Sequence, residues 1–173
     1  MNYKLGLVRF ACIAVMSAAS LSFGQSASDA DKKFVKDALQ GGNAEIELGK
    51  LAQKSKSDDV RQFGQKMVTD HTRMANHMRN VASQIGVDPP IGTSLSAKAE
   101  YGELKMLTGD SFDKAYIKAM VKDHQDDLNA FQQEASSGSS PAVKHAAEQG
   151  AKTVSSHLDL AKQIAANHQV DVQ

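Results

Sequence analysis

The chain has 173 residues with 20 basic and 20 acidic side chains, so its zero net charge gives no electrostatic reason to expect nucleic acid or an anionic membrane as its partner. Aromatic residues make up only 5% of the chain and tryptophan is absent, which favours a helical bundle built on small and aliphatic residues over a β-sandwich. The single cysteine, Cys12, excludes an internal disulfide framework and a Cys-x-x-Cys zinc or redox motif.

The first segment has the features of a secretory signal peptide. Lys4 and Arg9 precede the uncharged run 10–23, which is shorter than the ~20 residues that a membrane-spanning helix needs. Small residues follow this run, and we expect residues 1–24 to be removed, with cleavage possible as late as residue 27. Removal would take away the only cysteine, which suits an oxidising compartment such as the periplasm or the cell exterior. A retained membrane anchor is the alternative interpretation.

After residue 28 the apolar residues recur at steps of three and four, a pattern that predicts helices. We expect four long helices, over about 29–55, 57–85, 110–136 and 141–168. A shorter helix is expected over about 96–107, inside the long connection 86–109. The pair Gly41-Gly42 weakens the first helix and predicts either a close contact with another helix or a kink.

The lengths of the connections predict how the helices are arranged. The turns near residues 56 and 138 are short, whereas the connection 86–109 is long enough to run the length of the bundle. Two hairpins joined by one crossover form a ferritin-like four-helix bundle. The chain is therefore predicted to be all-α, with the bundle over 29–168 and a tail over 169–173. A plain up-down-up-down bundle is the alternative.

One acidic residue and three histidines interrupt the apolar stripes, each on a different long helix: Glu45, His71, His124 and His157. Counting residues from the turns places all four within roughly 6–8 Å of a common level near the middle of the bundle. A lone buried charge costs on the order of several kcal/mol, so such groups are expected to converge on a shared partner. Three imidazoles and a carboxylate suit Zn²⁺, Fe²⁺, Mn²⁺ or Cu²⁺, which makes these four residues the candidate ligands of one transition-metal ion.

The neighbouring acids Asp70 and Asp123 each precede a site histidine and therefore point about 100° away from it. They could support the histidines from the edge of the site, or they could be solvated carboxylates. The alternative to a metal site is a metal-free polar layer in which the buried groups only fix the register of the helices. His77 and His145 lie outside the stripes and are expected at the surface.

No P-loop, Gly-x-Gly-x-x-Gly or Gly-x-Ser-x-Gly motif occurs in the chain, so the pattern favours a non-enzyme. The favoured function is an exported helical-bundle protein that binds one metal ion for storage, buffering or stress protection. A metal-free structural or interaction module is the second hypothesis, and a metal-dependent oxidase is the third. No transmembrane span is expected after removal of the signal peptide.

Four runs of residues resemble a known family: 44–52 (AEIELGKLA), 67–71 (MVTDH), 112–124 (FDKAYIKAMVKDH) and 157–161 (HLDLA). They are similar to the bacterial secreted family called domain of unknown function 4142, in the ferritin-like group, over about residues 30–166. The resemblance implies a ferritin-like bundle exported to the envelope and implies no particular activity. The di-iron members of the wider group use Glu-x-x-His motifs, whereas this chain has Val68, Val121 and Val154 three residues before its histidines.

Overall fold

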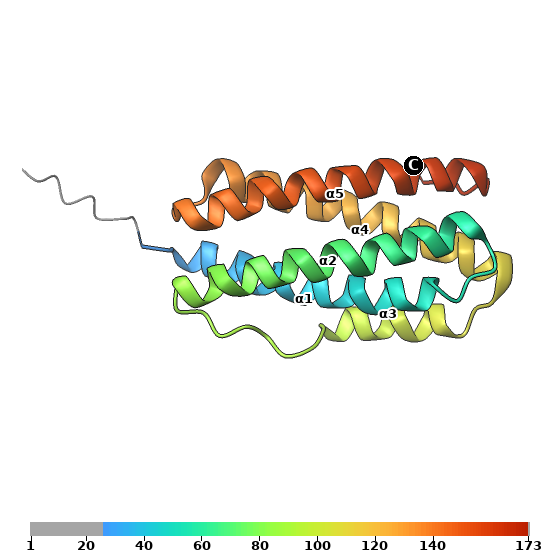
Figure 1. Cartoon of the computed structure of the whole chain (residues 1–173), viewed down its shortest axis with the longest axis horizontal. Coiled ribbons are helices and arrows are strands. Elements are labelled where there is room, and N and C mark those ends of the chain that lie inside the picture. Colours follow the sequence, from blue (N-terminus) through green and yellow to red (C-terminus); the bar gives the residue numbers. More distant parts are fainter. Residues whose placement is uncertain (1–25, 173) are drawn as a thin grey trace, which may run out of the picture.

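The computed structural model describes residues 26–172, which form five helices and no strand within that range (Figure 1). The long helices are α1 (Asp29–Ala52), α2 (Asp58–Gln84), α4 (Gly109–Ser137) and α5 (Pro141–Asn167), and the short helix is α3 (Leu95–Lys105). Every helix expected from the apolar pattern is present. The predicted signal peptide, residues 1–24, lies outside the described residues. No described helix combines the length and the apolar character needed to cross a membrane.

Local signals explain where the helices begin and end. Ser28 precedes α1 and forms a capping box with Asp31, in which each side chain accepts a hydrogen bond from the other residue's backbone N–H. Pro141 occupies the first turn of α5, where its missing N–H costs nothing. Gly86 ends α2 with a φ of 68°, a conformation that other residues rarely adopt. These short-range features place the helix ends close to their expected positions.

The helices form two hairpins, with α1 packed on α2 and α4 packed on α5. Figure 1 shows the α1–α2 turn and the α4–α5 turn at opposite ends of the bundle. The connection after α2 returns along the whole bundle and includes α3, which packs against α1 and α4. This long crossover confirms the predicted ferritin-like arrangement and makes the plain up-down-up-down alternative wrong.

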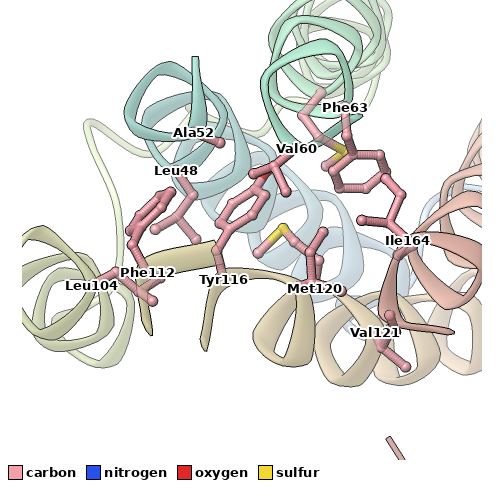
Figure 2. Packing of buried hydrophobic residues seen from close by; sticks show 14 of the residues in the cluster. Leu48, Ala52, Val60, Phe63, Leu104, Phe112, Tyr116, Met120, Val121 and Ile164 are labelled. Carbon is pink, nitrogen blue, oxygen red and sulfur yellow. The ribbon is translucent and has the colours of Figure 1, made fainter. Parts of the chain in front are cut away.

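Two clusters of buried side chains form the core, one on each side of the bundle's middle. Figure 2 shows part of the first cluster, where Leu104 joins Phe112 and Tyr116. Leu104 is the only fully buried residue of α3, and Tyr101 packs partly buried against the same cluster, so these two side chains attach the crossover helix to the core. In the first half of α1, Val35 and Leu39 are buried, and Phe34 and Ala38 are partly buried against the second cluster.

The helices α1 and α2 approach each other closely where Gly49 faces Gly64. A Cβ built on Gly64 would lie 2.7 Å from the backbone oxygen of Gly49, and one built on Gly49 would lie 2.9 Å from that of Gly64. The expectation that Gly41-Gly42 makes a close contact is wrong, because a Cβ on Gly41 would meet nothing within 4 Å and one on Gly42 would only reach His71 at 4.0 Å. Close packing instead requires glycine at the α1–α2 crossing and at Gly150 of α5, where a Cβ would lie 2.1 Å from the ring of Phe131.

Two buried acids, Asp31 and Glu134, stabilise the end of the bundle where the α4–α5 turn lies. The Asp31 carboxylate accepts hydrogen bonds from the backbone N–H groups of Ser139 at 2.9 Å and Ser140 at 3.3 Å. Burial acts to raise the pKa of Asp31, but hydrogen bonds from Glu134, Ser28 and Ser139 outweigh it and lower the pKa to about 2. Burial and the adjacent Asp31 raise the pKa of Glu134 to about 7. Between about pH 2 and pH 7, a protonated Glu134 therefore donates to an ionised Asp31.

Because of this pair, we expect the protein to lose stability as the pH rises from about 4.5 to above 7. The pKa of Glu134 is higher in the folded chain than the ordinary value of 4.5, so its stabilising effect is complete below pH 4.5 and is lost as the pH rises through about 7. Over this range we expect the free energy of unfolding of the wild type to fall by on the order of 1–3 kcal/mol. Glu134→Gln keeps a hydrogen-bond donor at all pH values and should not show this fall. Urea unfolding of both proteins between pH 4.5 and pH 8 measures the difference. If the free energies of unfolding of the two proteins changed with pH in parallel, the proposed hydrogen bond from protonated Glu134 to Asp31 would be contradicted.

Candidate metal centre

Three histidines from three helices meet in the interior of the bundle. His71 comes from α2, His124 from α4 and His157 from α5, and all three are buried. One ring nitrogen of each lies within 4.8 Å of the corresponding nitrogens of the other two. The centroids of the three rings are 5.3 to 5.7 Å apart. The residue count along the helices therefore predicted the convergence of these imidazoles correctly.

Two of the imidazoles are held in defined orientations by hydrogen bonds. Nδ1 of His124 lies 2.9 Å from the backbone carbonyl of Met120, one helical turn earlier. Because a carbonyl only accepts, this nitrogen carries the proton, and Nε2 keeps its lone pair. Nε2 of His157 lies 3.0 Å from Oδ2 of Asp70, so this nitrogen is the donor and Nδ1 keeps its lone pair. The two rings thus have opposite tautomers.

The nitrogens left over are buried and have no hydrogen-bond partner within residues 26–172. They are Nε2 of His124, Nδ1 of His157 and both ring nitrogens of His71. The rings pack edge to face or tilted against each other and do not hydrogen-bond to one another. Leaving a buried polar atom unpaired costs about 1–3 kcal/mol, so a cluster of such atoms indicates a site for a ligand.

Burial keeps the three imidazoles neutral at physiological pH. It lowers the pKa of His71 well below 6.5, with a further contribution from repulsion by His124 and His157. Burial lowers the pKa of His124 to about 4 and also lowers that of His157, although the hydrogen bond to Asp70 opposes the latter shift. A neutral imidazole has the lone pair that a metal ion requires. The protonation states therefore suit a metal site.

Glu45 is buried as expected but does not join the three imidazoles. Its Oε1 lies 4.0 Å from Nδ1 of His124, the nitrogen that donates to Met120. The group whose ligand atoms lie mutually within 4.8 Å consists of the histidines without Glu45. Burial raises the pKa of Glu45 well above 4.5, and repulsion from Asp127, Asp123 and Glu100 adds to the shift. In this arrangement Glu45 lies behind His124 and is not positioned as the fourth ligand.

The two acids that precede site histidines behave differently from each other. Asp70 accepts the hydrogen bond from His157 and also pairs with Lys66 at 2.8 Å, so it supports the site from outside. Asp123 instead lies 3.9 Å from Lys122 and lines a cavity next to α3. His77 and His145 are exposed, as expected.

Sequence reasoning missed several residues that surround the imidazoles. Phe63, eight residues before His71 on the same stripe, packs beside His124 and His157 with ring centroids 6.5 and 6.4 Å away. Asp127, three residues after His124, lines a small void beside His71. Helical spacing could have identified both residues. The Met120 carbonyl could not have been identified, because its contact depends on the rotamer of His124.

The imidazole triad fits a first-row transition-metal ion. Zinc binds imidazole nitrogen at ~2.0–2.1 Å, so two nitrogens in a tetrahedral site lie about 3.4 Å apart. Ring nitrogens separated by at most 4.8 Å need to move by less than about 1 Å each to reach that spacing, which small side-chain rotations provide. Three imidazoles with free lone pairs suit zinc, copper or iron, and the carboxylate behind His157 raises the basicity of its ligand nitrogen.

The comparisons with known proteins concern the family and the fold. The model of the family described as a domain of unknown function (DUF4142) matches residues 17–164. No curated protein matches the chain in sequence. A DUF305 fragment from Deinococcus radiodurans has a TM-score of 0.73 at 16% identity and covers 82% of this chain and 99% of its own.

Two further solved structures are similar. A predicted secreted protein of the DUF305 type from Streptomyces coelicolor has a TM-score of 0.71 at 14% identity, over 83% of this chain and 95% of its own. A two-domain protein from Anabaena variabilis, with DJ-1/ThiJ/PfpI-like and ferritin-like domains, has a TM-score of 0.60 at 15% identity, over 85% of this chain and 40% of its own. At such identities these likenesses establish a shared fold alone.

Proposed function

The chain belongs to the DUF4142 family, a domain of unknown function, and we propose that it is an exported helical-bundle protein that binds one transition-metal ion through His71, His124 and His157. The ion would be zinc, copper, iron or manganese. Its binding would serve storage, buffering or stress protection in the periplasm or outside the cell. The predicted signal peptide and the secreted DUF305 neighbour support the proposed location.

One observation carries this proposal: three buried imidazoles from separate helices bring ring nitrogens within 4.8 Å of one another, and each ring has a buried nitrogen without a hydrogen-bond partner among the described residues. A metal-free layer that fixes helix register would be expected to pair these nitrogens with one another or with nearby side chains. The hydrogen bonds that do exist leave lone pairs of His124 and His157 free. A metal ion is the partner that satisfies several such lone pairs at once.

The surroundings of the imidazoles favour holding an ion over catalysing a reaction with it. The rings are buried, and the void beside His71 has a volume of about 20 Å³, which is room for about one water molecule. A drug-sized substrate needs a pocket of roughly 300 Å³ or more. The Val residues three before each histidine also lack the carboxylates of a di-iron site. We therefore propose binding without turnover.

Calorimetric titration of the metal-free mature protein with Zn²⁺ and Cu²⁺ tests the proposal. We expect one ion per chain, and we expect His124→Ala to lower the affinity at least a hundredfold. Asp70→Ala should lower it about 10- to 100-fold, because it removes only the group that orients His157. His77→Ala, an exposed histidine on α2, is the matched control and should bind as the wild type does. The buried site would be refuted if His77→Ala abolished metal binding and His124→Ala left it intact.

A further inference from the structure

A large acidic cavity lies between α1, α3 and α4, with a volume of about 980 Å³. Three lysines line it, at positions 118, 122 and 162, together with six carboxylates: Glu45, Glu100, Glu103, Asp123, Asp126 and Asp127. One wall is the crossover helix α3, which supplies Glu100 and Glu103. A concave surface with excess negative charge concentrates cations and raises their rate of association.

Glu45 connects this cavity with the imidazole triad. The residue lines the cavity and is only 4% exposed, and its Oε2 has no hydrogen-bond partner in the protein. Its other oxygen lies 4.0 Å from Nδ1 of His124. A buried carboxyl oxygen without a hydrogen-bond partner is costly, and an arriving cation that binds it would relieve that cost. The inner wall of the cavity therefore carries a group suited to receive a cation.

Asp127 provides a second connection, on the side of His71. It lines the large cavity and also the void of about 20 Å³ beside that histidine. Gly42 of α1 borders the same void, and a Cβ there would lie 4.0 Å from Nδ1 of His71. Because Gly42 has no side chain, the void stays open between Asp127 and the ring of His71.

The opposite side of the triad is less suited to admit a cation. There Asp70 covers His157 and is paired with Lys66 and Arg73. These two positive side chains repel an approaching cation, whereas the cavity between α1, α3 and α4 attracts one. Phe63 covers a further side with an apolar ring that is 1% exposed.

We propose that the acidic cavity is the entry path by which a divalent cation reaches the imidazole triad, passing from the carboxylates of the cavity to Asp127 and then to His71. Glu45 assists this transfer by offering its unpartnered Oε2 to the ion on the side of His124. The inference rests on the proposed metal site. The ion would approach from the side of the acidic cavity, and the carboxylates there would guide it without being ligands of the final three-histidine site.

Stopped-flow mixing of the mature protein with Co²⁺, whose visible absorption reports imidazole coordination, tests the path. We expect Asp127→Asn to lower the association rate constant about tenfold and to weaken its dependence on salt, while the dissociation constant changes less than about threefold. Glu100→Gln, on α3 and away from the imidazoles, should lower the rate about threefold. Glu148→Gln removes an equal charge from the exposed surface of α5 and should leave the rate unchanged.

The outcomes separate this inference from the proposed function. If the wild type binds Co²⁺ while Asp127→Asn and Glu100→Gln associate at the wild-type rate, the entry path is refuted and the metal site stands. If Glu148→Gln slows association as much as they do, the effect comes from net charge and the path is also refuted. If the wild type shows no imidazole-bound Co²⁺, the proposed metal site fails and the entry path fails with it.

Discussion

Replacing Gly64 by alanine is expected to destabilise the protein by about 2–3 kcal/mol, although alanine is intrinsically the better helix former. The new Cβ would lie 2.7 Å from the backbone oxygen of Gly49 and 2.8 Å from the Cβ of Ala52. Neither atom belongs to a flexible chain end that could move aside, so α1 and α2 would have to separate. Thermal unfolding should show a fall in Tm of about 5–10 °C for a domain of this size.

Gly41→Ala is the matched control, because a Cβ at Gly41 would meet nothing within 4 Å. Here only the helix propensity changes, and we expect a gain of about 0.5–1 kcal/mol. Opposite signs for the two glycine-to-alanine changes would identify the α1–α2 crossing as the tightest contact of the hairpin. A neutral or stabilising effect of Gly64→Ala would contradict the close packing at this crossing.

Zinc is expected to stabilise the wild-type protein strongly and His71→Ala not at all. A ligand at a hundredfold excess over its dissociation constant adds about 2.7 kcal/mol to the free energy of unfolding, which corresponds to a rise in Tm of about 5–10 °C here. His71 contributes one of the three converging ring nitrogens of the proposed site. Differential scanning calorimetry with Zn²⁺ and then with a chelator measures the shift and its reversal.

His77→Ala serves as the control for this experiment, since His77 is an exposed residue on the same helix. It should retain the full rise in Tm with zinc and the full reversal with chelator. An equal response of wild type and His71→Ala would place the bound zinc elsewhere on the protein. A wild type that responds to neither zinc nor chelator would refute a structural effect of metal.

Much of the fold could be predicted because its signals are local. Ser28, Gly86 and Pro141 mark helix ends through backbone preferences that need no knowledge of the rest of the chain. The length of the 86–109 connection then favoured the crossover topology over a plain up-down-up-down bundle, and the structure confirms the crossover. The role of Gly49 and Gly64 could not be predicted, because it depends on where two helices cross.

The candidate site also has features that the sequence could predict and features that it could not. The convergence of His71, His124 and His157 followed from helical periodicity and residue counting, since a helix rises by a constant 1.5 Å per residue. The position of Glu45 did not follow, because counting gives the height of a residue and not the direction of its side chain. The rotamer of His124, which presents Nδ1 to both Met120 and Glu45, decides that question.

The acidic cavity was also beyond sequence reasoning. Glu100 lies on a short helix whose docking depends on Leu104, a long-range contact with the core. Asp123 was expected either at the edge of the histidine site or in solvent, and it lines the cavity that α3 helps to form. Charged residues on an amphipathic helix usually face solvent, so only the tertiary arrangement reveals that these carboxylates surround one space.

Nuclear magnetic resonance of ¹⁵N-labelled histidine, recorded before and after one equivalent of Zn²⁺, tests the buried metal site most directly. Before zinc is added, we predict that His124 carries its proton on Nδ1 and His157 carries its proton on Nε2. Zinc should then shift Nε2 of His124, Nδ1 of His157 and one nitrogen of His71 to metal-bound values, leaving His77 and His145 unchanged. Shifts confined to the exposed histidines, or no shifts at all, would contradict the buried metal site.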